Sequence, residues 1–236
     1  MRGVPSDYSV LVCYNLHEIY FKNHAMNETN KQSQTPAAEP AIDKVRRALR
    51  AGHVYRREDF VGISNAVDRH LSELVADGAL TRLAQGLYYA PKESVFGIVP
   101  ATDQKLVNAF LRDKDFLMFS PSSYNNLGLG TTQLYNKTFV YNHKRHGVFS
   151  FGNRSFDFRI KLRFPKRLTS EFLLIDAINN LAELAEDQNQ VCQMAQRKLR
   201  EFNLAKLNQA LAAYGSIATK KRFTKWLNDY NNRSGN

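Results

Sequence analysis

The sequence has few cysteines, no long apolar run and fewer acidic than basic side chains, and each shortage excludes a class of protein. Its two cysteines, Cys13 and Cys192, are too few and too far apart for a disulfide framework or a cysteine-based zinc site. No apolar run approaches the roughly 18 residues that cross a bilayer, so we expect no membrane segment. The apolar stretch at residues 8–14 ends too early for a signal peptide. We therefore expect a cytoplasmic protein.

The basic excess is concentrated in two blocks. The chain of 236 residues has 33 Lys and Arg against 22 Asp and Glu, a net charge of +11. Residues 137–167 hold nine basic groups and one acidic group, and residues 197–236 hold nine and two. Between these blocks, residues 168–196 hold five acidic groups and no basic one. This pattern favours a polyanionic partner, nucleic acid first, although charge runs are also typical of ordinary solvated faces.

Residues 1–40 are predicted to be an N-terminal extension. Residues 27–40 are polar and contain no large apolar side chain, which is typical of a linker or a disordered arm. Two interpretations of residues 1–25 stay open. Either Met26 is the true start and they are an upstream extension, or they form a short extra element packed on the body.

Residues 41–92 are predicted to form a winged helix-turn-helix. An apolar stripe of period 3.6 indicates a first helix that ends at Gly52, and residues 56–60 indicate a short second one. Ser64 is placed to cap a third helix, which ends at Gly78. Two short apolar strands around Gly86 then predict a β-hairpin. The buried stripe of the third helix is expected to be Val67, Leu71, Leu74 and Val75.

Residues 93–236 are predicted to be a mixed α+β domain with terminal helices, so the fold class is α+β. Strict alternation over residues 156–164 indicates a half-buried strand. Its inward set is Phe156, Phe158, Ile160, Leu162 and Phe164, and its outward set is Asp157, Arg159, Lys161 and Arg163. The role of the basic helical tail, residues 197–236, is left open.

The outward face of the third helix is the candidate DNA-reading surface. In a helix-turn-helix this face enters the major groove, where Arg69 can bridge guanine and Asn65 can pair with adenine. Ser64 and the helix N-terminus can bind a phosphate. Glu73 argues against this surface because phosphate would repel it. The candidate DNA-binding residues are Arg56, Arg57, Ser64, Asn65, Arg69, Ser72, Arg82 and Gln85.

A second candidate surface lies in the basic block of the α+β domain. We expect it to extend the DNA footprint through phosphate contacts, to bind RNA, or to dock an acidic protein. Its predicted members are Lys144, Arg145, Arg159, Lys161 and Arg163. We predict no catalytic residue, metal ligand or cofactor site, because the chain contains no P-loop, nucleophile elbow or zinc-protease motif.

Two segments carry a resemblance to a known family. Residues 64–91 (SNAVDRHLSELVADGALTRLAQGLYYAP) resemble the opening domain of AbiEi-type antitoxins, of the bacterial abortive-infection toxin–antitoxin systems. Residues 123–133 (SYNNLGLGTTQ) are similar to part of their second domain. The resemblance spans roughly residues 41–185. It leaves residues 1–40 without a counterpart and ends before the basic tail.

The resemblance implies a type IV antitoxin whose N-terminal domain binds its own operator and represses its own operon. It also implies that the C-terminal domain counters a nucleotidyltransferase-like toxin encoded alongside, without requiring a stable complex. The expected partners are therefore operator DNA and this toxin, with RNA as a further candidate and no membrane. The alternative is an RNA- or protein-binding module whose winged helix does not recognise DNA.

Overall fold

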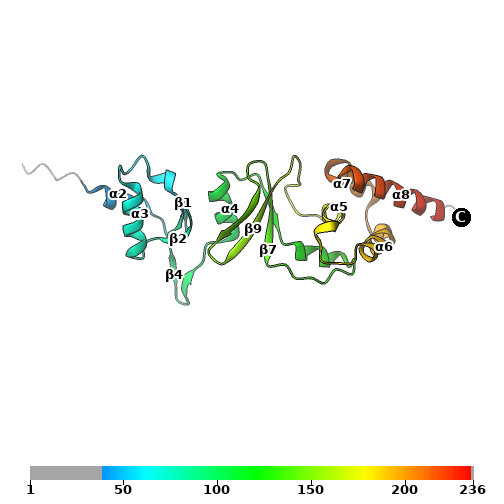
Figure 1. Ribbon diagram of the computed structural model, residues 1–236, viewed down its shortest axis with the longest axis horizontal. Helices are drawn as coiled ribbons and strands as arrows, with labels where there is room; N and C mark the ends of the chain where they lie inside the picture. The colour runs from blue at the N-terminus through cyan, green and yellow to red at the C-terminus, as the bar shows by residue number, and fades with distance from the viewer. Residues whose placement is uncertain (1–38, 235–236) are drawn as a thin grey trace, which may run out of the picture.

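The computed structural model describes residues 39–234, and its side chains as far as Asp229. The extension predicted for residues 1–40, with the two alternatives for residues 1–25, falls almost wholly outside the described residues. The described chain is elongated, and its elements follow one another along the long axis (Figure 1). The fold is mixed α+β, as the sequence predicts.

The N-terminal elements are helices and three short strands. They are α2 (Ala41–Ala48), β1 (Val54–Arg56), the 3-10 helix η1 (Arg57–Phe60), α3 (Val67–Ala76), β2 (Thr81–Ala84) and β3 (Leu87–Tyr89). The strands form an antiparallel sheet in the order β1–β3–β2. The sequence predicts both α-helices and the hairpin but misses β1, which is too short to show an alternating pattern.

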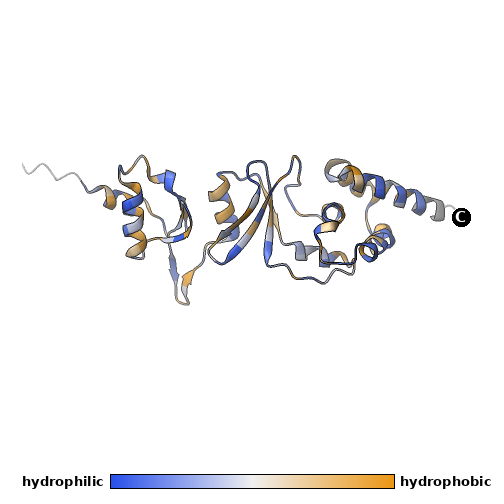
Figure 2. Ribbon diagram, in the orientation of Figure 1, coloured by the Kyte–Doolittle hydropathy of each residue, from blue (hydrophilic) through white to orange (hydrophobic). Residues whose placement is uncertain are grey.

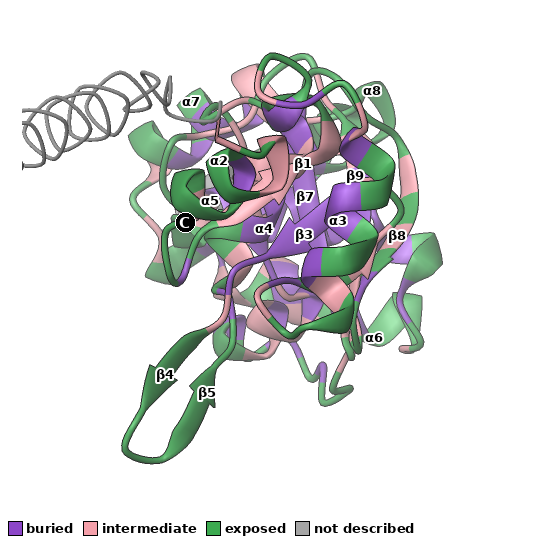
Figure 3. Ribbon diagram, turned by 90° about the vertical axis from the view of Figure 1, so that its left-hand side faces the viewer, coloured by how far each residue is buried: buried purple, intermediate pink, exposed green. Residues whose placement is uncertain are grey.

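A protruding hairpin follows this sheet, formed by β4 (Lys92–Ser94) and β5 (Gly97–Val99). Every residue from 92 to 100 is exposed, and Val95 and Phe96 at the tip are 94% and 98% exposed. Figure 3 shows the hairpin projecting from the body, and Figure 2 shows apolar colour on it. Its base is held by the hydroxyl of Tyr89, which donates to the carbonyl of Val99 at 2.5 Å.

A second sheet lies in the middle of the chain. Its elements are α4 (Asp103–Leu111), β6 (Leu117–Phe119), the 3-10 helix η2 (Pro121–Leu127), β7 (Lys137–Asn142), β8 (Gly147–Phe151) and β9 (Arg154–Ile160). The strand order is β6–β7–β9–β8, with β7 and β9 parallel and the other pairs antiparallel.

The C-terminal end is helical. Its elements are α5 (Ser170–Asn179), η3 (Leu181–Glu183), α6 (Gln188–Lys198), η4 (Leu199–Glu201), α7 (Leu204–Tyr214) and α8 (Ile217–Ser234). Within the described residues, no helix combines the length and the apolar character that crossing a bilayer requires.

Three hydrophobic cores alternate with the two sheets. The first joins α2 and α3 to one face of the N-terminal sheet, through side chains such as Leu71 and Tyr88. The second joins the opposite face, through Leu87 and Tyr89, to α4 and the second sheet. The third packs the far face of the second sheet against the C-terminal helices. The second core thus continues across position 92, where the sequence places a domain boundary.

The strand predicted for residues 156–164 differs from the structure. It ends at Ile160, which is 54% exposed, and Leu162 beyond it is 86% exposed. Asp157, predicted to face solvent, is buried. The prediction is wrong because α5 and the core around it cover the face that it assigns to water, so that Phe156, Asp157 and Phe158 are all buried although they alternate between the two faces.

A buried hydrogen-bond network joins the second sheet to α5. Asp176 is 2% exposed and accepts hydrogen bonds from the hydroxyls of Tyr124 at 2.6 Å and Tyr141 at 2.8 Å. Asn180 donates to the Tyr141 hydroxyl at 3.1 Å. Burial raises the pKa of Asp176, and the two tyrosine hydroxyls oppose that shift by stabilising the carboxylate.

We expect Tyr124→Phe to lower the free energy of unfolding by about 1–3 kcal/mol, because it removes a donor from a buried carboxylate. Urea denaturation followed by circular dichroism measures this. Tyr135→Phe is the control, since its hydroxyl accepts an exposed hydrogen bond from the amide of Ala185. The control is expected to change stability by less than about 0.5 kcal/mol. Equal effects of the two substitutions would contradict a special role for the buried network.

Candidate nucleic-acid interface

Helix α3 presents one buried face and one exposed face. Val67, Leu71 and Leu74 are buried in the first core, as the sequence predicts. On the opposite side, Arg69, Ser72 and Ala76 are exposed, and Asn65 is exposed in the turn before the helix. The hydroxyl of Ser72 donates back to the carbonyl of Asp68 at 2.8 Å. The outward set that the sequence predicts is therefore brought together on one surface.

Ser64 has a different role from the predicted one. The helix begins at Val67 with Ala66 as its N-cap, so Ser64 is not the cap. Ser64 is 4% exposed, and its Oγ accepts from the amide of Ala66 at 3.0 Å and shares a hydrogen bond of 2.8 Å with His70 Nδ1. Its hydroxyl is thus committed to fixing the turn before α3 and cannot reach a phosphate.

Sequence reasoning missed His70, although the signal was present. The residue lies three positions after Val67 and four before Leu74, and therefore on the buried face of the helix. Its side chain is 6% exposed.

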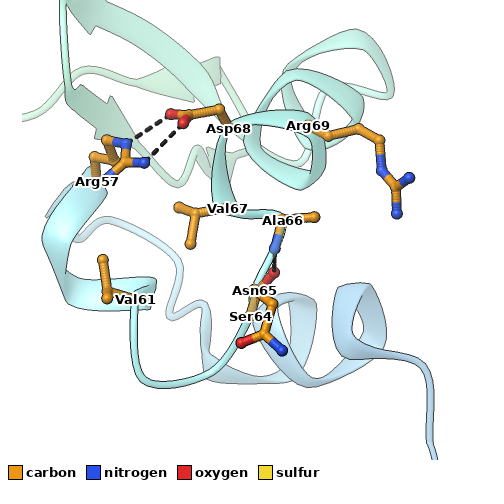
Figure 4. A pocket seen from close by; sticks show the side chains of 8 residues that line it. All are labelled: Arg57, Val61, Ser64, Asn65, Ala66, Val67, Asp68 and Arg69. Carbon is orange, nitrogen blue, oxygen red and sulfur yellow. Dashed lines mark hydrogen bonds and ion pairs between the residues drawn. The ribbon is translucent and has the colours of Figure 1, made fainter.

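A hollow of about 400 Å³ opens at the N-terminal end of α3 (Figure 4). It is lined by Arg57, Val61 and the residues from Ser64 to Arg69. The view shows Arg57 pointing toward Asp68, whereas Arg69 extends from the other side of the helix. The hollow is therefore bordered by two arginines and one carboxylate.

Arg57 is paired within the protein. Its Nε and Nη2 each donate to the carboxylate of Asp68 at 2.7 Å, a bidentate pair. These two hydrogen bonds lower the pKa of the Asp68 carboxyl group and raise the pKa of the Arg57 guanidinium. The sequence assigns Arg57 to a DNA phosphate, but in the structure this arginine links η1 to α3. The pairing joins positions 11 residues apart with no local pattern, so the sequence could not reveal it.

Arg56 is directed away from α3. Its Nε lies 3.1 Å from a carboxylate oxygen of Glu58, and its Nη1 donates to the carbonyl of Phe110 in α4 at 3.4 Å. The side chain is 23% exposed. Arg56 therefore contacts η1 and α4 in this structure, and its predicted contact with the DNA backbone stays a prediction.

Arg69 remains accessible. Its side chain is 72% exposed and its Nε lies 3.6 Å from Glu73, one helical turn away. This exposed pair holds the guanidinium weakly, because water screens both charges.

The hairpin beside α3 presents Arg82 and Gln85, which are both exposed. The turn between β2 and β3 needs Gly86, whose φ is 70°. The carbonyl of Gly86 accepts from the amide of Arg57 at 3.0 Å, and that of Leu83 accepts from the amide of Gly152 at 3.0 Å. The hairpin is thus tied both to η1 and to the β8–β9 turn.

The predicted basic patch does not form one surface. The side chain of Arg159, in β9, is only 11% exposed; it donates to Asp157 at 2.8 Å and to Glu183 at 2.5 Å, and its guanidinium lies 3.9 Å from the ring centre of Phe139. Burial disfavours the charge of Arg159, but the hydrogen bonds to Asp157 and Glu183 raise its pKa. Arg159 therefore stabilises the fold and is unavailable to a polyanion.

The other predicted patch members are separated. Lys144 pairs with Asp113 at 2.9 Å, and Arg145 lies over the ring of Phe110. Lys161 and Arg163 follow the end of β9 and border a different hollow. Among the side chains that the structure describes, no three of His, Cys, Asp and Glu are grouped so as to hold a metal ion.

Ser64→Ala is expected to destabilise the protein, because His70 and the Ala66 amide lose their buried partner. At about 1–3 kcal/mol for an unsatisfied buried group, and about 2–4 °C per kcal/mol, the midpoint of thermal unfolding should fall by several degrees. Ser72→Ala is the matched control on the exposed face and should leave the midpoint nearly unchanged. A midpoint of Ser64→Ala within a degree of wild type would refute this role.

Comparisons with known proteins place the chain in a family. No curated protein matches the sequence. The crystal structure of the RV2827C protein from Mycobacterium tuberculosis is 15% identical, with a TM-score of 0.48 over 79% of this chain and 74% of that chain. A model described as a family of unknown function, DUF6088, matches residues 41–209. Because this match covers well over half of the sequence, the protein belongs to the DUF6088 family.

Proposed function

We propose that this protein is a cytoplasmic, sequence-specific DNA-binding repressor of its own operon and the antitoxin of an AbiE-like pair. The observation that carries the DNA-binding part is the exposed face of α3, with Asn65, Arg69 and Ser72 on one surface. In this proposal α2, η1 and α3 are the three helices of a winged helix-turn-helix. The β2–β3 hairpin is its wing.

The residue chemistry of this face suits a major groove. Arginine can donate two hydrogen bonds to guanine, and an asparagine amide can both donate to and accept from adenine. Arg69 would have to exchange Glu73, and a contact of its Nη2 with His70 Nε2 at 3.4 Å, for a base; the cost of leaving Glu73 is small because that pair is exposed. Arg82 is exposed and has no ion pair among the described residues, which suits a phosphate contact from the wing.

The DNA-binding proposal is tested by binding of the full-length protein to its own upstream duplex and to a scrambled duplex, over several salt concentrations. A specific regulator should prefer its operator by about 10³-fold or more. Arg69→Ala is expected to reduce this preference by roughly 5- to 150-fold, the 1–3 kcal/mol of one bidentate base contact. Fluorescence anisotropy with labelled duplexes measures both quantities.

Two control variants sharpen the result. Arg69→Lys keeps the charge but loses the bidentate geometry, so it should lose preference while keeping the salt dependence of wild type. Lys114→Ala removes an exposed charge between α4 and β6 and should leave preference unchanged. Wild-type protein that binds both duplexes equally, or an Arg69→Ala variant with full preference, would argue against recognition by α3.

The antitoxin part rests on the resemblance of residues 64–91 and 123–133. The second of these segments is anchored in the structure, because Glu186 accepts hydrogen bonds from the amides of Thr132 and Gln133 at 2.8 and 3.1 Å. It passes close to α6, where Gly130 faces Gln190. These contacts place the segment with the C-terminal helices and away from α3 (Figure 1).

We expect co-expression to relieve the growth defect caused by a nucleotidyltransferase-like protein encoded beside this gene. Arg69→Ala should keep this rescue while losing repression of a reporter placed behind the operator, because the two roles are assigned to different parts of the chain. Colony counts and reporter activity measure the two outcomes separately. Absence of rescue by the wild-type protein would remove the antitoxin role and leave the DNA-binding role intact.

A second candidate function is an RNA- or protein-binding module. The observation that favours it is the presence of Asp68 and Glu73 beside Arg57 and Arg69, which lowers the positive charge of the α3 surface. Weak binding to both duplexes with equal salt dependence would support this candidate.

A further inference from the structure

A further hollow, of about 450 Å³, is lined by residues of α5, of the α7–α8 turn and of the chain after β9. In Figure 1, α5, α7 and α8 lie at the end of the molecule away from α3. The side chains that matter to the chemistry of this hollow are Lys161, Arg163, Asn179, Tyr214, Ser216 and Lys220. We call it the basic hollow.

Every charged residue in the wall of the basic hollow is a cation. Lys161, Arg163 and Lys220 border it, and no Asp or Glu does. The hollow at the N-terminal end of α3 has Asp68 in its wall, and another hollow, lined by residues of α2 and α3, has Glu73. Asp176, on the adjoining helix α5, is 2% exposed and accepts a hydrogen bond from Tyr141, so it cannot meet a ligand. The basic hollow is therefore the better anion site of the two regions.

The walls of the basic hollow are held in place by hydrogen bonds. Asn179 donates to the carbonyl of Tyr214 at 2.9 Å and accepts from the amide of Ser216 at 2.9 Å, which fixes the α7–α8 turn against α5. Gly215 allows this close approach, because a Cβ there would lie 2.7 Å from the carbonyl oxygen of Leu211. A fixed wall lowers the ordering cost of binding.

The cations reach the hollow from two sides. The Lys161 amide donates to the carbonyl of Asn142, and its Nζ lies 5.0 Å from the ring centre of Tyr141. Lys220 lies one turn into α8 and donates to the carbonyl of Ala212 at 2.8 Å. The N-terminus of α8, an 18-residue helix, adds its partial positive charge beside Lys220. An anion seated between them would be attracted by both walls.

The hollow also offers apolar surface next to the charge. Leu162 stands between Lys161 and Arg163 in the sequence and is 86% exposed, and Tyr214 also lines the hollow. The volume falls within the roughly 300–1,000 Å³ of small-ligand sites. A group that is anionic at one end and flat and apolar at the other matches this lining.

We propose that the basic hollow binds one phosphorylated nucleotide, with its phosphate held among Lys161, Arg163 and Lys220 and its base against Leu162 and Tyr214. The nucleotide is either free or part of a single-stranded polynucleotide, and both present the same chemistry to the site. This role is independent of DNA recognition by α3, so that the two can fail separately.

The experiment measures binding of inorganic phosphate, AMP and a short single-stranded oligoribonucleotide to the full-length protein, by calorimetry and anisotropy. Arg163→Gln and Lys220→Gln should each weaken binding of AMP or the oligoribonucleotide by about tenfold or more, the effect of losing a charged hydrogen bond. Lys221→Gln is the matched control, since it removes the same charge from the next residue of α8, outside the hollow. Lys220→Arg should restore binding.

The results show whether the site binds a nucleotide and whether that nucleotide is free or part of a polymer. AMP that binds and competes with the oligoribonucleotide supports the site and indicates a free nucleotide, whereas binding of the oligoribonucleotide alone supports the site and indicates a polymer. If Lys221→Gln lowered the affinity for the probes as much as Arg163→Gln, the proposal would be overturned, because the probes would then be attracted by the overall positive charge. Absence of binding by every probe would also overturn it. Arg69→Ala should leave all these affinities unchanged. Arg163 has no ion pair among the described residues, so its replacement tests the site without disturbing the fold.

Discussion

Burial of both sheets on both faces is the constraint on which the rest of the structure depends. A short strand such as β3 contributes Tyr88 to one core and Leu87 and Tyr89 to the next, so each residue stabilises one side of the sheet. The same holds for β7, where Val140 faces α4 while Phe139 and Tyr141 face the C-terminal helices. Because successive cores share a sheet, the orientation of α3 is determined by packing that reaches into the middle of the chain.

The charged groups inside the molecule follow from this layering. A sheet face closed by helices cannot leave Arg159 or Asp157 solvated, so these side chains are paired with each other and with Glu183. Asp176 lies deeper and is stabilised by tyrosine hydroxyls rather than by a direct cation contact. Much of the basic block at residues 137–167 is consequently structural, and the cations left free gather at the exit of β9.

The features that sequence analysis predicts correctly are local ones. Each of these features depends on neighbours a few residues apart in the sequence. They are the apolar stripe of α3, the exposure of Arg69 and Ser72, and the turn at Gly86. The contacts that the sequence does not reveal arise where a distant segment decides the environment. Arg57 needs Asp68, Arg56 faces α4, and Arg159 is covered by α5, and no periodicity in the sequence encodes those encounters. His70 is the exception, since its position on the apolar stripe was visible.

The shared sheet also limits how this protein can be recombined. Residues 41–90 carry Leu87 and Tyr89 on a face that is covered, among the described residues, mainly by α4 and the second sheet. Transplanted alone onto another protein, this segment would expose that face to water, so a functional exchange of the N-terminal part has to include α4. The segment that can be exchanged is therefore longer than the segment proposed to touch a partner, and it cannot end at the β4–β5 hairpin.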